Sequence, residues 1–160
     1  MTDQGLTNIF MLSMLQKCRL HRFKGVFSCD TIPKDIVKMK HFTLICNIDR
    51  EDEPGSHYVA IIGQPHRIIY NDPLALNILN ADISEFLETA TLYGKRKLEL
   101  KNRAVQHPLS LFCGFHAMLQ VLFYDCDNHH FKIKYSRSDL WKNDIIVIRM
   151  IKKFFHLYTG

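Results

Sequence analysis

The feature that most constrains this chain is a nearly continuous apolar run from Cys113 to Tyr124. Only His116 and Gln120 interrupt the run, so a helix formed from it must be buried on every side. The run is shorter than the roughly 18 residues that a membrane span needs. We therefore expect a central buried helix in a soluble protein, with no membrane partner.

Length and composition indicate one globular unit. The 160 residues match about one average domain, and neither repeats nor linkers divide them, so we expect a single domain over residues 1–160. Five cysteines form an odd number in a chain that is large enough to need no disulfide framework. This favours reduced thiols in an intracellular setting. We also expect the chain to be a monomer.

The periodicity of apolar residues predicts helices at both ends and strands between them. A first helix should extend to about Cys18 with Thr7 or Asn8 as its N-cap. Three β-branched and aromatic runs predict adjacent strands over residues 42–48, 57–62 and 67–70.

Further elements follow these strands. A capping-box spacing at residues 82–85 predicts a helix to about Leu92, and residues 97–105 should be extended. A last helix is expected over about residues 144–157, with one apolar face formed by Ile145, Ile148, Ile151, Phe154 and Phe155. The order of elements is that of an α+β domain.

Cys113 is the candidate nucleophile. It should occupy the first turn of the apolar helix, where unpaired N–H groups and the positive dipole end favour a thiolate. Gly114 leaves space beside the sulfur, and Gln106 lies seven residues upstream. The Gln106 amide and the Cys113 backbone N–H could converge as an oxyanion hole.

A nucleophilic cysteine also needs a base that a third group orients. His57 opens the second predicted strand and Asp72 closes the third, so both should lie at one edge of the sheet. His116 is the alternative base, and Asn71 is the alternative orienting group. Cys29 and Cys46 lie in apolar surroundings and are expected to be core thiols.

Metal binding is a different interpretation of the same residues. Three Cys-x-x-His spacings, at Cys18, Cys113 and Cys126, resemble zinc-ligand pairs. They would suit a non-catalytic, zinc-stabilised nucleic-acid-binding module. The apolar, helical context of Cys113 argues against a metal site, so we expect no metal and no cofactor for the chemistry.

The order His57, Asp72, Gln106, Cys113 resembles that of the adenovirus protease (adenain) family and, more distantly, of the SUMO-specific ubiquitin-like proteases. The resemblance covers about residues 5–125 and includes Phe23–Phe27, Gly55–Ala60 and Ile69–Pro73. It implies a papain-like, ubiquitin-like-protease fold with a mixed central sheet flanked by helices. It also implies a thiol endopeptidase that cuts viral precursor polypeptides at Gly-containing sites, in the host nucleus or the virion.

The resemblance also assigns further roles. Tyr58, where these families usually have Trp, would line a narrow tunnel for glycine together with Gly114. Deubiquitination or deSUMOylation at Gly-Gly conjugates is the alternative activity of the same site. Adenovirus enzymes are activated by a peptide tethered through a cysteine upstream of the glutamine, whereas residues 95–105 contain no cysteine.

The charge distribution is uneven along the chain. Residues 1–90 carry 9 Lys and Arg against 11 Asp and Glu, whereas residues 91–160 carry 12 against 5. The basic excess favours a DNA or polyanion activator, although a solvated face would have the same composition. The densest basic segment comprises Lys95, Arg96, Lys97, Lys101 and Arg103.

Overall fold

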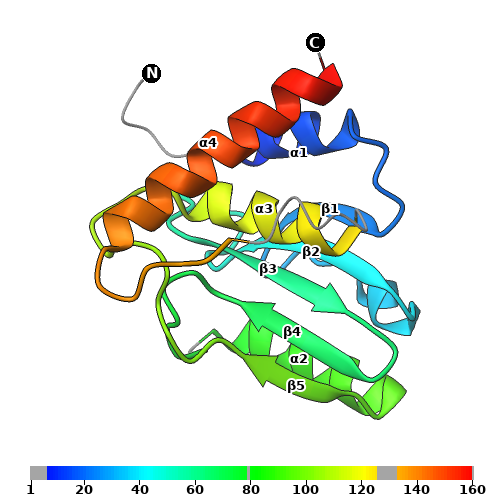
Figure 1. Cartoon of the computed structure of the whole chain (residues 1–160). Coiled ribbons are helices and arrows are strands. Elements are labelled where there is room, and N and C mark those ends of the chain that lie inside the picture. The colour runs from blue at the N-terminus through cyan, green and yellow to red at the C-terminus, as the bar shows by residue number, and fades with distance from the viewer. Residues whose placement is uncertain (1–6, 79, 126–132, 160) are drawn as a thin grey trace.

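The computed structural model describes residues 7–78, 80–125 and 133–159. Its centre is a five-stranded mixed sheet with the strand order β1-β2-β3-β4-β5 (Figure 1). The outer pairs β1/β2 and β4/β5 are parallel, whereas β2/β3 and β3/β4 are antiparallel. The strands are β1 (Phe23–Ser28), β2 (Phe42–Asn47), β3 (Tyr58–Gly63), β4 (Arg67–Asn71) and β5 (Lys97–Leu100).

Helices cover both faces of the sheet. α3 packs on β2 and β3, with α1 and α4 on the same side, while α2 and the 3-10 helix η1 lie on the other side (Figure 1). The helices of the described residues are α1 (Asn8–Gln16), η1 (Lys34–Lys38), α2 (Ala81–Gly94), α3 (Cys113–Asp125) and α4 (Leu140–Thr159). This arrangement confirms the α+β prediction.

Alternating strand residues supply two apolar cores. Ile45 and Ile62 face the cluster that includes the buried side chains of α3, whereas Leu44 and Ile61 face the cluster that includes α2. Because β2 and β3 are buried along their whole length, the sheet holds both helical layers in place. The nine consecutive or nearly consecutive buried residues of α3 confirm the prediction of a central buried helix.

The ends of the helices and strands agree with the predicted ends only in part. Thr7 caps α1, since its Oγ accepts the Phe10 N–H at 3.2 Å. The cap of α2 is Asn80, not the predicted Asp82, because the Asn80 side chain accepts the Ile83 N–H at 3.0 Å. β5 ends at Leu100 and is shorter than predicted.

Two expectations need correction. The short strand β1 is not among the predicted strands, because Gly25 interrupts the pattern of apolar residues in this segment. α4 begins at Leu140, and its inward face agrees with the prediction except at Ile145, which is 48% exposed. Ile151, Phe154 and Phe155 are buried, Ile148 packs against the same core, and Val147 is a further buried residue of this face. Within the described ranges, no helix has the length and apolar character needed to span a membrane.

Candidate active site

Cys113 is the first residue of α3, and its side chain is buried. The helix begins here because the preceding segment turns, with Ser110 N–H bonded to the His107 carbonyl. The sulfur therefore lies beside the unpaired N–H groups of a helix N-terminus. That position favours negative charge.

His57 and Asp72 meet at the sheet edge where β3 begins and β4 ends. His57 directly precedes β3 and Asp72 directly follows β4, and these two strands are antiparallel neighbours. His57 Nε2 lies 2.7 Å from Asp72 Oδ1, and both side chains are buried. Asp72 Oδ1 also accepts the Leu74 N–H at 2.8 Å, which fixes the carboxylate.

The electrostatics of His57 depend on its two neighbours. Burial lowers its pKa, but hydrogen bonds and charge interactions with Asp72 and Cys113 outweigh this and raise the pKa to about 9. Because Nε2 is bound to Asp72, the other ring nitrogen, Nδ1, is the one available to the sulfur. The ring thus connects the carboxylate to the thiol.

Gln106 is buried in the segment that precedes α3. Its backbone N–H and that of Val105 both donate to the Pro73 carbonyl, at 3.0 and 2.8 Å. Its side-chain Nε2 donates to the Ser110 carbonyl at 3.0 Å, which uses one of the two amide hydrogens.

A cleft of about 880 Å³ opens over these residues. His57, Gln106 and Cys113 all line it. The rest of the lining mixes charged, neutral polar and apolar side chains, among them Arg50, Glu51, Glu53, Leu74 and Leu111. An extended polypeptide of mixed character would fit such a lining.

The two residues expected to form a glycine tunnel differ in position. Tyr58 lines the cleft, and its hydroxyl donates to Asn8 Oδ1. Gly114 is buried in the first turn of α3, directly after Cys113. Its place in a glycine tunnel stays a prediction.

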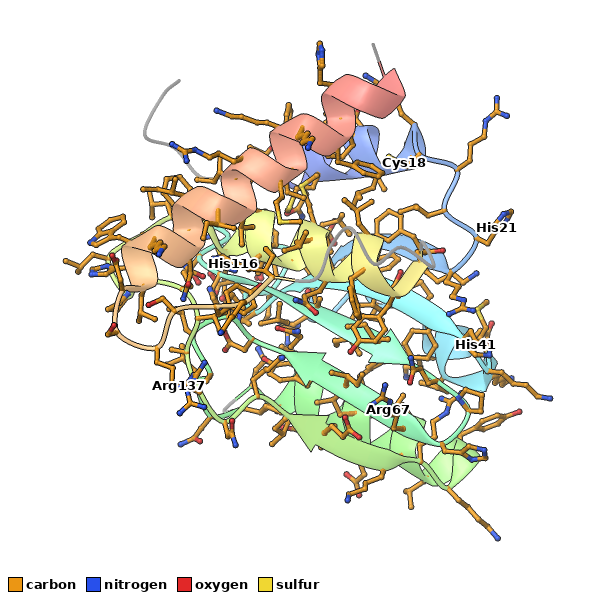
Figure 2. All side chains as sticks on the ribbon, viewed as in Figure 1. Cys18, His21, His41, Arg67, His116 and Arg137 are labelled. Carbon is orange, nitrogen blue, oxygen red and sulfur yellow. The ribbon has the colours of Figure 1, made fainter. Side chains whose placement is uncertain are left out.

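His116, the alternative base, and Asn71, the alternative orienting group, do not contact the His57 ring in the hydrogen bonds of the described residues. His116 lies on α3 beside the first part of α4 (Figure 2), and its Nε2 is 2.8 Å from Asp144 Oδ1. Asn71 is buried next to Asp72, and its Nδ2 has no partner. Asp72, not Asn71, holds the His57 ring.

The two metal-like spacings that the structure describes are not brought together. Figure 2 shows Cys18 and His21 on the side of the molecule toward the end of α3 opposite to His116. Cys126 and His129 lie outside the described residues, and among the described ones no group of three or more His, Cys, Asp or Glu side chains could hold a metal ion. Burial raises the pKa of the Cys29 and Cys46 thiols, which keeps them neutral.

The basic segment is mostly on the surface. Lys95, Lys97, Lys101 and Arg103 are exposed around the edge strand β5. Arg96 is an exception, since its guanidinium is buried and donates to the carbonyls of Val37 and Met39. Arg96 therefore ties β5 to η1 and cannot belong to a surface polyanion site.

Sequence reasoning missed several polar residues near the site. Asn47 is buried and lines the cleft, and its Oδ1 accepts the Asp49 N–H at 2.9 Å. Asn143 and Asp144 are fully buried at the start of α4. In the sequence, Asn143 and Asp144 are two adjacent polar residues at the start of an apolar helical pattern. Such a pair is typical of an ordinary, exposed helix cap and does not indicate burial.

No family of known proteins matches the sequence, and no curated protein matches it. Among solved structures, the fold is similar to the selenomethionine crystal structure of the ASFV pS273R protease, with a TM-score of 0.59 and 16% identity. The match covers 93% of this chain and 68% of that chain. The likeness shows that this chain shares the fold of that protease, and the mixed central sheet flanked by helices agrees with the predicted fold class.

Proposed function

We propose that this chain is a cysteine endopeptidase in which Cys113 is the nucleophile, His57 the base and Asp72 the orienting acid. The observation that carries the proposal is the position of the His57 ring. The ring is bound to Asp72 at 2.7 Å, interacts with Cys113, and lines the same cleft as Cys113. The fold similarity to a protease supports the same conclusion.

In the first half of the reaction, the Cys113 sulfur forms a bond to the scissile carbonyl carbon as the carbonyl π electrons move to oxygen. His57 Nδ1 holds the thiol proton. The proton then passes to the leaving nitrogen as the C–N bond breaks, so the amine departs neutral and a thioester remains.

Water completes the cycle. His57 Nδ1 accepts one proton from water while the water oxygen bonds to the thioester carbon. The C–S bond then breaks, the acid product leaves, and the proton returns to the sulfur. Asp72 keeps Nε2–H directed away from the sulfur throughout, which leaves Nδ1 free for each transfer.

The negatively charged oxygen that forms in each half of the reaction needs hydrogen-bond donors. We assign this role to the Gln106 amide hydrogen that is not bonded to the Ser110 carbonyl and to the Cys113 backbone N–H. The Cys113 N–H is available because it lies at the start of a helix. Such donors stabilise charge that exists only near the transition state.

The substrate proposal is more specific. We propose viral or virus-like precursor polypeptides cut at Gly-containing sites, with the Tyr58 ring limiting side-chain size. Ubiquitin-like proteins with a Gly-Gly end are the second candidate, because they would present the same backbone to Tyr58. A polyanion such as DNA is the proposed activator, acting through the four exposed residues around β5.

The deciding experiment is to alkylate the native protein with iodoacetamide at mildly acidic pH and to map the modified cysteine. Modification should occur at Cys113 and be lost in His57→Ala, and Cys113→Ala should abolish peptide cleavage. Cys18→Ala is the matched control and should retain both the alkylation of Cys113 and peptide cleavage. Cleavage by purified Cys113→Ala would overturn the proposal.

A further inference from the structure

The first turn of α4 is bonded to the segment on both sides of Gln106. Three of its residues, Trp141, Asn143 and Asp144, contact Val105 and His107. α4 is the last element that the structure describes, and none of its described side chains lines the cleft. The contacts therefore join the C-terminal helix to the proposed oxyanion donor.

Asp144 binds two separate elements. Its Oδ2 accepts the His107 N–H at 3.2 Å, one residue after Gln106. Its Oδ1 lies 2.8 Å from His116 Nε2, on the turn of α3 that follows Cys113. A single buried carboxylate thus fixes the Gln106 segment relative to the nucleophile helix.

Asn143 holds the other side of Gln106. Its Nδ2 donates to the Val105 carbonyl at 3.0 Å and to the Ser136 carbonyl at 2.9 Å. Its Oδ1 accepts the Ser136 N–H at 2.7 Å. Every polar atom of this buried amide is therefore used, which is typical of a rigid polar network.

Trp141 adds a contact at the surface. Its ring stacks on His107, with centroids 4.1 Å apart and an interplanar angle of 18°. The His107 ring is fixed in turn, since its Nδ1 accepts the Leu109 N–H at 3.1 Å. The conformation of residues 105–107 is therefore determined from α4 at three points.

We propose that Trp141, Asn143 and Asp144 are positioning residues that set the oxyanion donor of Gln106 relative to Cys113. This inference rests on the proposed function. It makes the C-terminal helix part of the catalytic apparatus, although none of the three residues touches the reacting atoms.

The first test does not depend on turnover. In Asn143→Asp the side chain keeps its size but loses both donated bonds, so amide hydrogen exchange of residues 105–110 should accelerate at least fivefold while that of β2 and β3 stays unchanged. Lys142→Ala, at an exposed position between the anchors, is the matched control. Unchanged exchange of residues 105–110 in Asn143→Asp would overturn the proposal even if no peptide is ever cleaved.

The second test asks whether the contacts act through Gln106. We expect Asn143→Asp to lower kcat about tenfold with KM and the Cys113 alkylation rate unchanged. In a Gln106→Ala background the same change should lower kcat less than twofold, because the group it positions is gone. Equal losses in both backgrounds would show a general structural effect and would overturn the positioning role.

A milder variant guards against a folding defect. Trp141→Ala removes only the stacking contact, so it should retain the wild-type melting temperature and still lower kcat about threefold. The proposed function is tested separately, by asking whether the wild type cleaves a peptide and Cys113→Ala does not. That result would stand even if the three residues of α4 proved to have no positioning role.

Discussion

The carbonyl oxygen of Pro73 accepts the backbone N–H of Gln106 at 3.0 Å. Pro73 directly follows Asp72, so the acid that orients His57 and the proposed oxyanion donor lie on segments bonded to each other. The Val105 N–H donates to the same oxygen, so two N–H groups share the Pro73 carbonyl. The site is therefore organised by main-chain bonds as well as by side chains.

Because Gln106 is held in this way, its replacement should affect chemistry and not folding. We expect Gln106→Ala to lower kcat about 10²-fold with little change in KM, since the oxyanion forms only near the transition state. Steady-state kinetics on a peptide substrate measure both constants. Gln16→Ala, at the exposed end of α1, is the control and should match the wild type. A change confined to KM would contradict the role.

The raised pKa of His57 predicts a pH limit. Its folded pKa of about 9 lies above the ordinary 6.5, so the imidazolium is retained through neutral pH. kcat/KM should fall as pH rises through about 9. The stabilisation gained from charged His57 is full below pH 6.5 and is lost over the same rise toward pH 9.

Asp72→Asn supplies the matched test for this pH limit. The amide can still hold the ring but no longer favours the imidazolium, so the alkaline limb should move to lower pH. A pH profile of kcat/KM for both proteins measures the difference. An alkaline limb that stays in place in Asp72→Asn would mean that another group controls it.

His116 should be a stability residue and not the base. His116→Ala leaves the buried Asp144 Oδ1 without its partner, so the free energy of unfolding should fall on the order of 3 kcal/mol. Urea unfolding measures this loss, and iodoacetamide should still modify Cys113 at the wild-type rate. His57→Ala, in contrast, should abolish the alkylation of Cys113. Loss of Cys113 reactivity in folded His116→Ala would make His116 the base.

Much of the site was predictable because it depends on local sequence and on strand order. The apolar run after Cys113 requires a buried helix, and antiparallel strands that begin just after His57 and end just before Asp72 must bring these ends together. Both relationships follow from short-range patterns. The sequence therefore indicated that the His57 and Asp72 side chains would meet at one edge of the sheet.

Long-range polar contacts were not predictable in the same way. Asp144 contacts His107, 37 residues earlier, and Arg96 contacts Val37, 59 residues earlier. No periodicity distinguishes a buried aspartate or arginine from an exposed one, because their burial depends on carbonyl and N–H groups supplied by distant segments. For the same reason Arg96 was wrongly placed on the surface.

Substrate choice should depend on the Tyr58 ring. If the ring narrows the cleft, Gly→Ala replacements in a peptide at the two positions before the cut should lower kcat/KM at least 10²-fold. Tyr58→Phe keeps the ring and should preserve this discrimination, whereas Tyr58→Ala should reduce it to less than tenfold. A substrate panel measured with all three proteins decides the point. Equal rates for Gly and Ala peptides with the wild type would remove the tunnel.

Polyanion binding should depend on four exposed residues, namely Lys95, Lys97, Lys101 and Arg103. They surround the edge strand β5, and the chain continues from them directly to Gln106, so binding there could reach the oxyanion donor. Four phosphate contacts predict a slope of about −3.5 for log affinity against log salt on duplex DNA. Binding through phosphates would be independent of DNA sequence.

Neutralising these four residues to Gln should flatten the salt slope and remove any stimulation of peptide cleavage by DNA. The control neutralises four other exposed cations, Lys17, Arg19, Lys34 and Lys40, and so carries the same net charge. Retained binding in the control and lost binding in the β5 variant would localise the site. If both variants lose affinity equally, the attraction depends only on net charge, and DNA would have no specific place in the activation of this protein.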